Sequence, residues 1–148
     1  MHTSPSHLTT ADLLSILPHR PPMLLVDEVS DLICGQRASA RVYIRPDWEV
    51  FTGHFPDRPV LPGIYITECM AQAAGAMLLA APDNRGCLPL LFEVSRMRFL
   101  HPVLPGDTLC TQAALSEAAG GMYVCTAASY VGERCVARGR LTLALKHP

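Results

Sequence analysis

Residues 62–80 read PGIYITECMAQAAGAMLLA, and the organisation of the whole chain follows from this segment. Pro62-Gly63 is a helix start, and the residues after it are apolar on almost every side, which is typical of a helix buried on most of its faces. Glu68 is the only acidic or basic side chain between Pro59 and Pro82. The segment therefore predicts a long central helix from residue 63 to about residue 80.

Four strand-length runs follow this helix. They cover residues 90–101, 108–117, 122–131 and 135–146, with hairpin chemistry between them at Pro105-Gly106-Asp107, Gly120-Gly121 and Gly132-Glu133. The last run has a period of two, as in a strand with one buried face: one face carries Leu141, Leu143 and Leu145, and the other carries Arg138, Arg140 and Thr142. A long buried helix against a mostly later antiparallel sheet predicts an α+β domain.

The part of the chain before residue 62 has a mixed pattern. Residues 1–10 are rich in Ser, Thr, Pro and His and are expected to be loosely ordered, and a short helix is expected between residue 10 and Pro18. Residues 23–29 and 38–45 are strand-like. Four prolines and a glycine predict an irregular loop over residues 46–62, and a loop of this length in a small domain is usually functional or part of an interface.

Length and composition exclude several classes of protein. The chain has 148 residues, which predicts one domain over 1–148. Its net charge of −1 gives no field that attracts nucleic acid or an anionic membrane, and Glu68 and Gln72 interrupt the most apolar segment, so we expect no membrane span. Charged residues make up 17%, below the average of about 25%, which leaves surface for another subunit.

Motif searches remove further candidates. The six cysteines contain no Cys-x-x-Cys pair and predict reduced, buried thiols in a cytoplasmic protein, with no metal site. No secretory signal is recognisable in residues 1–20. Phosphate-binding glycine loops, the Gly-x-Ser-x-Gly elbow and His-Glu-x-x-His are all missing from the sequence, so nucleotide, nicotinamide and zinc-protease chemistry have no support.

Two isolated side chains and one backbone position carry the possible chemistry. Burial of Glu68 in an apolar helix favours the protonated carboxyl group that a general acid requires, although a structural Glu bonded to a backbone donor is the alternative. His54, in the proline-rich loop, can serve as a base near neutral pH, or be structural or interfacial. Gly63 at the helix N-terminus offers an unpaired N–H to a developing negative charge, or is an ordinary helix start.

These residues lie in blocks that resemble a known family. GHFPDRPVLPGIYITECMAQAAG (53–75) resembles the signature of the (3R)-hydroxyacyl-[acyl carrier protein] dehydratases, in the branch with a catalytic Glu. LPHR (17–20), LLVD (24–27), RF (98–99) and PVLPGD (102–107) resemble its flanking blocks. The resemblance implies a hot-dog fold, in which a highly curved antiparallel sheet wraps a long central helix. It also implies a homodimer whose sites each combine His from one subunit with Glu from the other, and a trimer of such dimers in many members.

The resemblance further implies a hydro-lyase of fatty-acid or related polyketide or polyene biosynthesis, which converts a (3R)-3-hydroxyacyl-[acyl carrier protein] into the trans-2-enoyl product. His54 would remove the C2 proton and Glu68 would protonate the leaving hydroxyl, while Gly63 polarises the thioester carbonyl. Phe55 and Gln72 complete the implied substrate-binding set, with Gln72 orienting Glu68. No cofactor is implied, because the acyl group arrives on the phosphopantetheine arm of its carrier protein.

The sequence departs from the family pattern near its expected docking surface. Leu100-His101 stands where the family has a basic pair, which leaves Arg96 and Arg98, together with His101 when it is charged, to contact the acidic carrier protein. Strand alternation predicts that both arginines face one side, with Met97 and Phe99 packed inward. Two rival functions are a hot-dog thioesterase, which would hydrolyse the thioester, and a non-catalytic acyl-binding subunit, which would need neither His54 nor Glu68.

Overall fold

The computed structural model describes residues 6–148. Within this range it contains two α-helices, two short 3-10 helices and six strands that form one antiparallel sheet in the order β1-β2-β4-β5-β6-β3. In chain order the elements are α1 (Thr10–Ile16), β1 (Glu28–Ile33), β2 (Arg37–Tyr43), η1 (Glu49–Thr52), α2 (Gly63–Leu79), η2 (Pro82–Asn84), β3 (Leu88–Phe99), β4 (Thr108–Ala119), β5 (Met122–Val131) and β6 (Arg134–Lys146).

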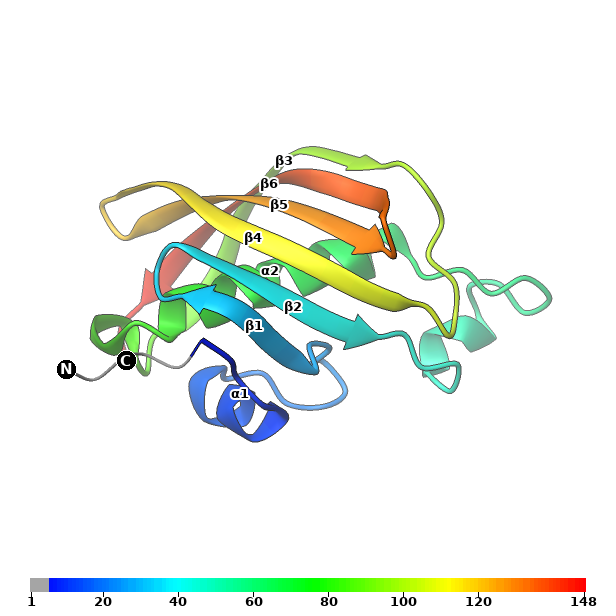
Figure 1. Ribbon diagram of the computed structural model, residues 1–148, viewed down its shortest axis with the longest axis horizontal. Coiled ribbons are helices and arrows are strands. Elements are labelled where there is room, and N and C mark those ends of the chain that lie inside the picture. The colour runs from blue at the N-terminus through cyan, green and yellow to red at the C-terminus, as the bar shows by residue number, and fades with distance from the viewer. Residues whose placement is uncertain (1–5) are drawn as a thin grey trace.

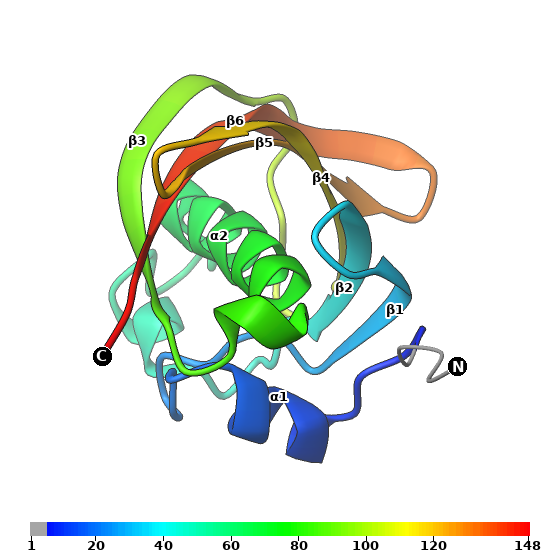
Figure 2. The same ribbon diagram turned by 90° about the vertical axis from the view of Figure 1, so that its left-hand side faces the viewer.

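The sheet curls around α2 and encloses most of the helix (Figures 1 and 2). α2 has 17 residues and is about 25 Å long, and nearly every residue of its second half is buried. α1 lies on the side of α2 that the sheet leaves open (Figure 2), where Leu13 and Ile16 join the core. This arrangement confirms the expected α+β class and hot-dog fold. No helix among residues 6–148 is long and apolar enough to cross a membrane.

The edge strand β3 and its neighbour β6 differ in how far their apolar side chains are buried. In β6, Leu141 and Leu143 are buried against α2, as the sequence predicts. β3 forms one edge of the sheet and pairs only with β6. Its apolar side chains are unusually exposed, reaching 68% for Phe92. An edge strand with an exposed apolar surface is a ready partner for another chain.

The strand expected over residues 23–29 is wrong, because β1 begins only at Glu28. The reason is a side chain far away in the sequence. The amide oxygen of Gln72 accepts the backbone N–H of Leu25 at 2.9 Å and of Val26 at 3.4 Å, and its Nε2 donates to the carbonyl of Met23 at 2.7 Å. These backbone groups therefore form hydrogen bonds with the Gln72 side chain of α2 rather than with a neighbouring strand.

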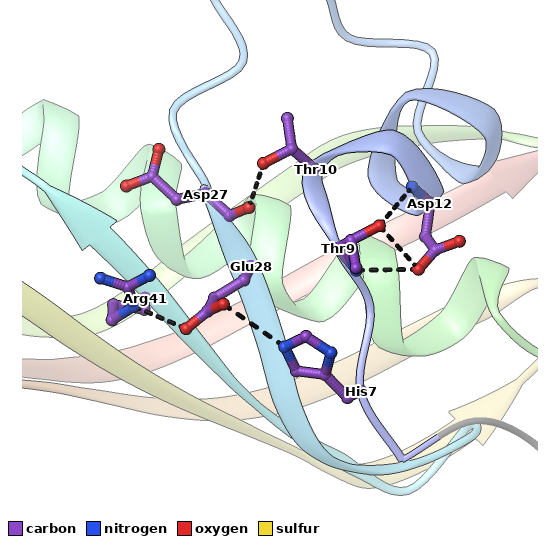
Figure 3. A network of polar contacts seen from close by, with 7 residues as sticks. All are labelled: His7, Thr9, Thr10, Asp12, Asp27, Glu28 and Arg41. Carbon is purple, nitrogen blue, oxygen red and sulfur yellow. Dashed lines mark hydrogen bonds and ion pairs between the residues drawn. The ribbon is translucent and has the colours of Figure 1, made fainter.

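The N-terminal segment also needs correction. Residues 1–5 lie outside the described range, but Leu8 is 1% exposed and its backbone pairs with Val29. The side chain of Glu28 accepts hydrogen bonds from Arg41 at 2.7 Å and His7 at 3.3 Å, which tie the segment to β1 and β2 (Figure 3). Residues 6–10 are thus part of the fold, because one apolar side chain within a polar segment reaches the core.

Candidate active site

His54 is held in the loop between η1 and α2. Its Nδ1 lies 2.7 Å from the carbonyl oxygen of Val60, and the Val60 N–H donates to the carbonyl of His54 at 2.9 Å. A carbonyl oxygen can only accept, so Nδ1 carries the proton and the neutral ring has its lone pair on Nε2. The next residue, Leu61, donates to the carbonyl of Val103 at 2.8 Å. The loop therefore leaves Nε2 as the one ring nitrogen of His54 that can accept a proton.

Gly63 is the first residue of α2 and lies in the same cavity as His54. This cavity measures about 330 Å³, and its other walls include Ile66, Phe99 and His101. The Gly63 N–H donates to no other atom of residues 6–148, as expected for a first-turn amide. A Cβ at this position would come within 3.0 Å of the Phe99 ring. A side chain at this position would therefore press on the Phe99 ring that lines the cavity.

Glu68 lies five residues further along α2, which turns its side chain by about 140° from Gly63. Its Oε1 accepts a hydrogen bond of 2.8 Å from Nε2 of Gln72, one turn later. Gln72 is fully buried, so its link to the site passes through Glu68 and not through direct contact with a ligand. Glu68 itself is 21% exposed and borders a separate cavity of about 830 Å³, lined also by Met23, Trp48 and Tyr65.

The single chain does not bring His54 and Glu68 together. The cavity of His54 and the cavity of Glu68 share no lining residue. Phe55, expected in the substrate-binding set, stacks on His54 at 4.1 Å between ring centroids and is 52% exposed, lining neither cavity. His54 and Glu68 therefore occupy two different regions of one chain.

Sequence reasoning missed His19, to which the sequence analysis assigned no role. Its Nε2 lies 3.7 Å from Oε1 of Glu68. The available signal was its position in the LPHR block, but nothing in that block indicates contact with a helix about fifty residues later.

The thiol next to Glu68 is not a candidate nucleophile. Cys69 is fully buried, and this burial raises the pKa of the thiol strongly. Burial also raises the pKa of Cys125 to about 11. Both groups therefore stay protonated and unreactive near neutral pH. Among residues 6–148 no three His, Cys, Asp or Glu side chains gather in a way that could hold a metal ion.

Arg96 and Arg98 are both exposed on β3. Met97 packs against the core, and half-exposed Phe99 covers Gly63. Strict alternation is broken here, because the register shifts between Ser95 and Arg98 and Arg96 has a φ of 54°.

Comparisons with known proteins agree with this architecture. The FabA-like domain family matches residues 17–140. A 3-hydroxyacyl-[acyl-carrier-protein] dehydratase FabZ from Roseiflexus sp. (strain RS-1) is 36% identical over 93% of this chain and 96% of its own length. A protein of the same name from Herpetosiphon aurantiacus is 38% identical over 93% and 98%. The dehydratase heterocomplex ApeI:P from Xenorhabdus doucetiae superposes with a TM-score of 0.76 at 20% identity, covering 91% of each chain.

A long central helix wrapped by a curved antiparallel sheet defines the hot-dog class of protein. Within that class the match over residues 17–140 is specific: this chain belongs to the FabA-like family.

Proposed function

We propose that this chain dehydrates (3R)-3-hydroxyacyl-[acyl carrier protein] to the trans-2-enoyl product and is therefore a hydro-lyase. Its relatives named FabZ dehydratase at 33–38% identity support the activity. The observation that carries the proposal is the orientation of His54, whose basic Nε2 shares a cavity with the free N–H of Gly63. A base beside an amide donor is the arrangement that proton removal next to a carbonyl requires.

In the first part of the reaction, Nε2 of His54 takes the proton from C2 of the acyl group. Negative charge then develops on the thioester oxygen, and the Gly63 N–H at the positive end of the α2 dipole stabilises it. Because this donor is fixed by the helix, it needs no reorganisation as the charge appears. The Phe99 ring against Gly63 closes one side of the cavity.

In the second part, Glu68 gives its proton to the 3-hydroxyl group. The C3–O bond breaks, water leaves, and the electron pair from C2 forms the C2–C3 double bond. His54 is then protonated and Glu68 is a carboxylate, so exchange of one proton with solvent at each residue restores the starting state. Proton transfer alone completes this chemistry, so we propose no cofactor beyond the phosphopantetheine arm of the substrate.

The active unit that we propose is a homodimer formed along β3. β3 leaves one backbone edge unpaired and exposes Leu90, Leu91, Phe92 and Val94. Pairing two such edges would cover these side chains and place the cavity of His54 from one subunit beside Glu68 of the other. This arrangement explains why one chain holds the base and the acid in separate cavities. We propose that three of these dimers assemble further into a hexamer.

We also propose that Arg96 and Arg98 contact the acidic carrier protein. Neither arginine forms an ion pair within residues 6–148. Arg98 lies directly across from Arg138 of β6, and like charges in that position repel each other. An acidic partner would relieve this repulsion.

Mass spectrometry of the products from a 3-hydroxyacyl carrier-protein substrate tests the proposed reaction. Loss of water supports dehydration. Release of a free acid would instead identify a thioesterase, and an unchanged substrate would indicate a non-catalytic acyl-binding subunit.

A further inference from the structure

The side chain of His19 has an unusual environment beside Glu68. His19 and Glu68 are 20% and 21% exposed, and the distance from Nε2 of His19 to Oε1 of Glu68 is 3.7 Å. The other ring nitrogen, Nδ1, is fully buried and has no hydrogen-bond partner among residues 6–148. A buried polar atom without a hydrogen-bond partner lowers the stability of the folded state, so its presence requires a physical explanation.

The buried Nδ1 determines which form of the ring fits the site. A protonated imidazolium carries an N–H on both nitrogens, so it would bury an Nδ1–H donor with no acceptor. The guanidinium of Arg20 donates to the backbone carbonyl of His19 at 2.7 Å, so the charged group nearest in sequence is also a cation. Glu68 is the acidic group within 4 Å that would favour the imidazolium, and it does so only as a carboxylate. A neutral His19 thus fits a protonated Glu68.

The neighbouring amide decides which nitrogen of the neutral ring carries the proton. The oxygen of Gln72 accepts the backbone N–H of Leu25 and Val26, so its Nε2 must face Glu68 and donate to Oε1. Oε1 of Glu68 is therefore an acceptor. A lone pair on Nε2 of His19 would be repelled by the lone pairs of this oxygen, whereas an Nε2–H would be attracted to them.

We propose that His19 is a positioning residue for Glu68, which as the neutral Nε2–H tautomer directs a second donor at Oε1 and so keeps the acidic proton on Oε2. This inference rests on the proposed role of Glu68 as the acid. The 3.7 Å separation is longer than a hydrogen bond, and catalytic hydrogen bonds commonly shorten on the way to the transition state. As the proton leaves Oε2, both donors stabilise the forming carboxylate.

Nitrogen NMR of the protein labelled with 15N-histidine tests the tautomer without any assay of activity. The His19 signals are assigned by their loss in a His19→Gln variant. We expect the Nε2–H tautomer at pH 7. An imidazolium or an Nδ1–H tautomer at this pH would overturn the proposal.

Kinetics test the function of the donor. We expect His19→Leu to lower kcat about tenfold with little change in KM, and His19→Gln, which keeps an N–H donor, to recover most of the loss. The basic limb of the kcat profile should move to higher pH in His19→Leu, because a donor stabilises a carboxylate more than a carboxylic acid. Equal losses in both variants with an unmoved pH profile would show a merely structural role and overturn the proposal.

A matched control lies on the surface. His7 is half-exposed and lies 3.3 Å from Glu28, so His7→Leu removes a histidine from a similar pair away from the site (Figure 3). This variant should keep the wild-type kcat. Failure of the two proposals is distinguishable. Release of a free acid or an unchanged substrate in the product assay overturns the proposed function, and an active Glu68→Gln variant overturns the role of Glu68 as the acid. An inactive Glu68→Gln with a fully active His19→Leu overturns only the role of His19.

Discussion

His54 can accept a proton through only one nitrogen, because Nδ1 is committed to the Val60 carbonyl at 2.7 Å. Glu68 is constrained in a similar way, because its Oε1 accepts the hydrogen bond from Nε2 of Gln72. Each of the two groups therefore has one atom left for chemistry. Positioning of this kind contributes to catalysis because the reacting atoms need no search for the correct orientation.

His54→Ala and Glu68→Gln should each lower the rate of dehydration by about 10²–10⁴-fold, the usual contribution of a general base or acid. Both side chains border cavities, so the variants should remain folded, as checked by circular dichroism and thermal melting. Steady-state assays with a 3-hydroxyacyl carrier-protein substrate measure the loss. Near wild-type turnover in either variant would remove that residue from the mechanism.

At the level of elements, α1 depends on a cap at its N-terminus. The side chain of Thr9 accepts the N–H of Asp12 at 3.2 Å, and Asp12 accepts the N–H of Thr9 at 2.8 Å, which forms a capping box (Figure 3). The backbone N–H and the hydroxyl of Thr9 both donate to the Asp12 carboxylate, and these two hydrogen bonds hold the pKa of Asp12 below its ordinary value of 3.8. α1 closes the open side of α2, so its cap bears on the stability of the whole fold.

Asp12→Ala should lower the melting temperature by a few degrees at pH 7. Because folding lowers the pKa of Asp12, its stabilising effect is complete above the unfolded value of 3.8 and is lost as the pH falls through the folded value. The difference in melting temperature from wild type should therefore shrink towards pH 2.5. Glu133→Ala, in the exposed β5–β6 turn, serves as the control. A difference that stays constant with pH would contradict the role of the ionised cap.

At the level of the whole molecule, the exposed edge of β3 and the two separate cavities have one explanation. A dimer across β3 would cover the apolar edge and complete both sites together. Native mass spectrometry reports whether the chain forms dimers and whether three dimers assemble further.

Mixing the two inactive variants tests whether the sites are shared. A heterodimer of His54→Ala and Glu68→Gln holds one site with both residues intact and one with neither. After full random exchange of equal amounts, about a quarter of the wild-type activity should return. If exchange is verified by mass spectrometry and activity stays absent, each site must lie within one subunit.

The double variant Arg96→Ala/Arg98→Ala tests the docking surface. Charges at the rim of an interface act mainly on association and its salt dependence, so kcat/KM for a carrier-protein substrate should fall about tenfold at low salt and become less salt-sensitive. Activity on a short, uncharged thioester mimic should hardly change. Arg37→Ala, on β2 far along the sheet, is the control. Equal losses on both substrates would indicate damage to the site and exclude a docking role.

Much of the fold could be predicted from local patterns. The apolar run after Pro62-Gly63 gives α2 its start and its length, and the Gly-containing turns separate β4, β5 and β6. These features depend on residues close together in the sequence, where periodicity and turn chemistry act. The false strand at residues 23–27 shows the limit, because its backbone groups bond to Gln72, more than forty residues later.

The candidate site likewise has some features that the local sequence determines and others that only tertiary packing determines. His54, Gly63 and Glu68 stand out in the sequence because each has an uncommon local setting: a polar group in an apolar segment or a glycine at a helix start. Packing alone placed His54 and Glu68 in separate cavities and His19 against Glu68. Sequence patterns report which side chains would be costly to bury, whereas the distances between them depend on how the sheet closes around α2.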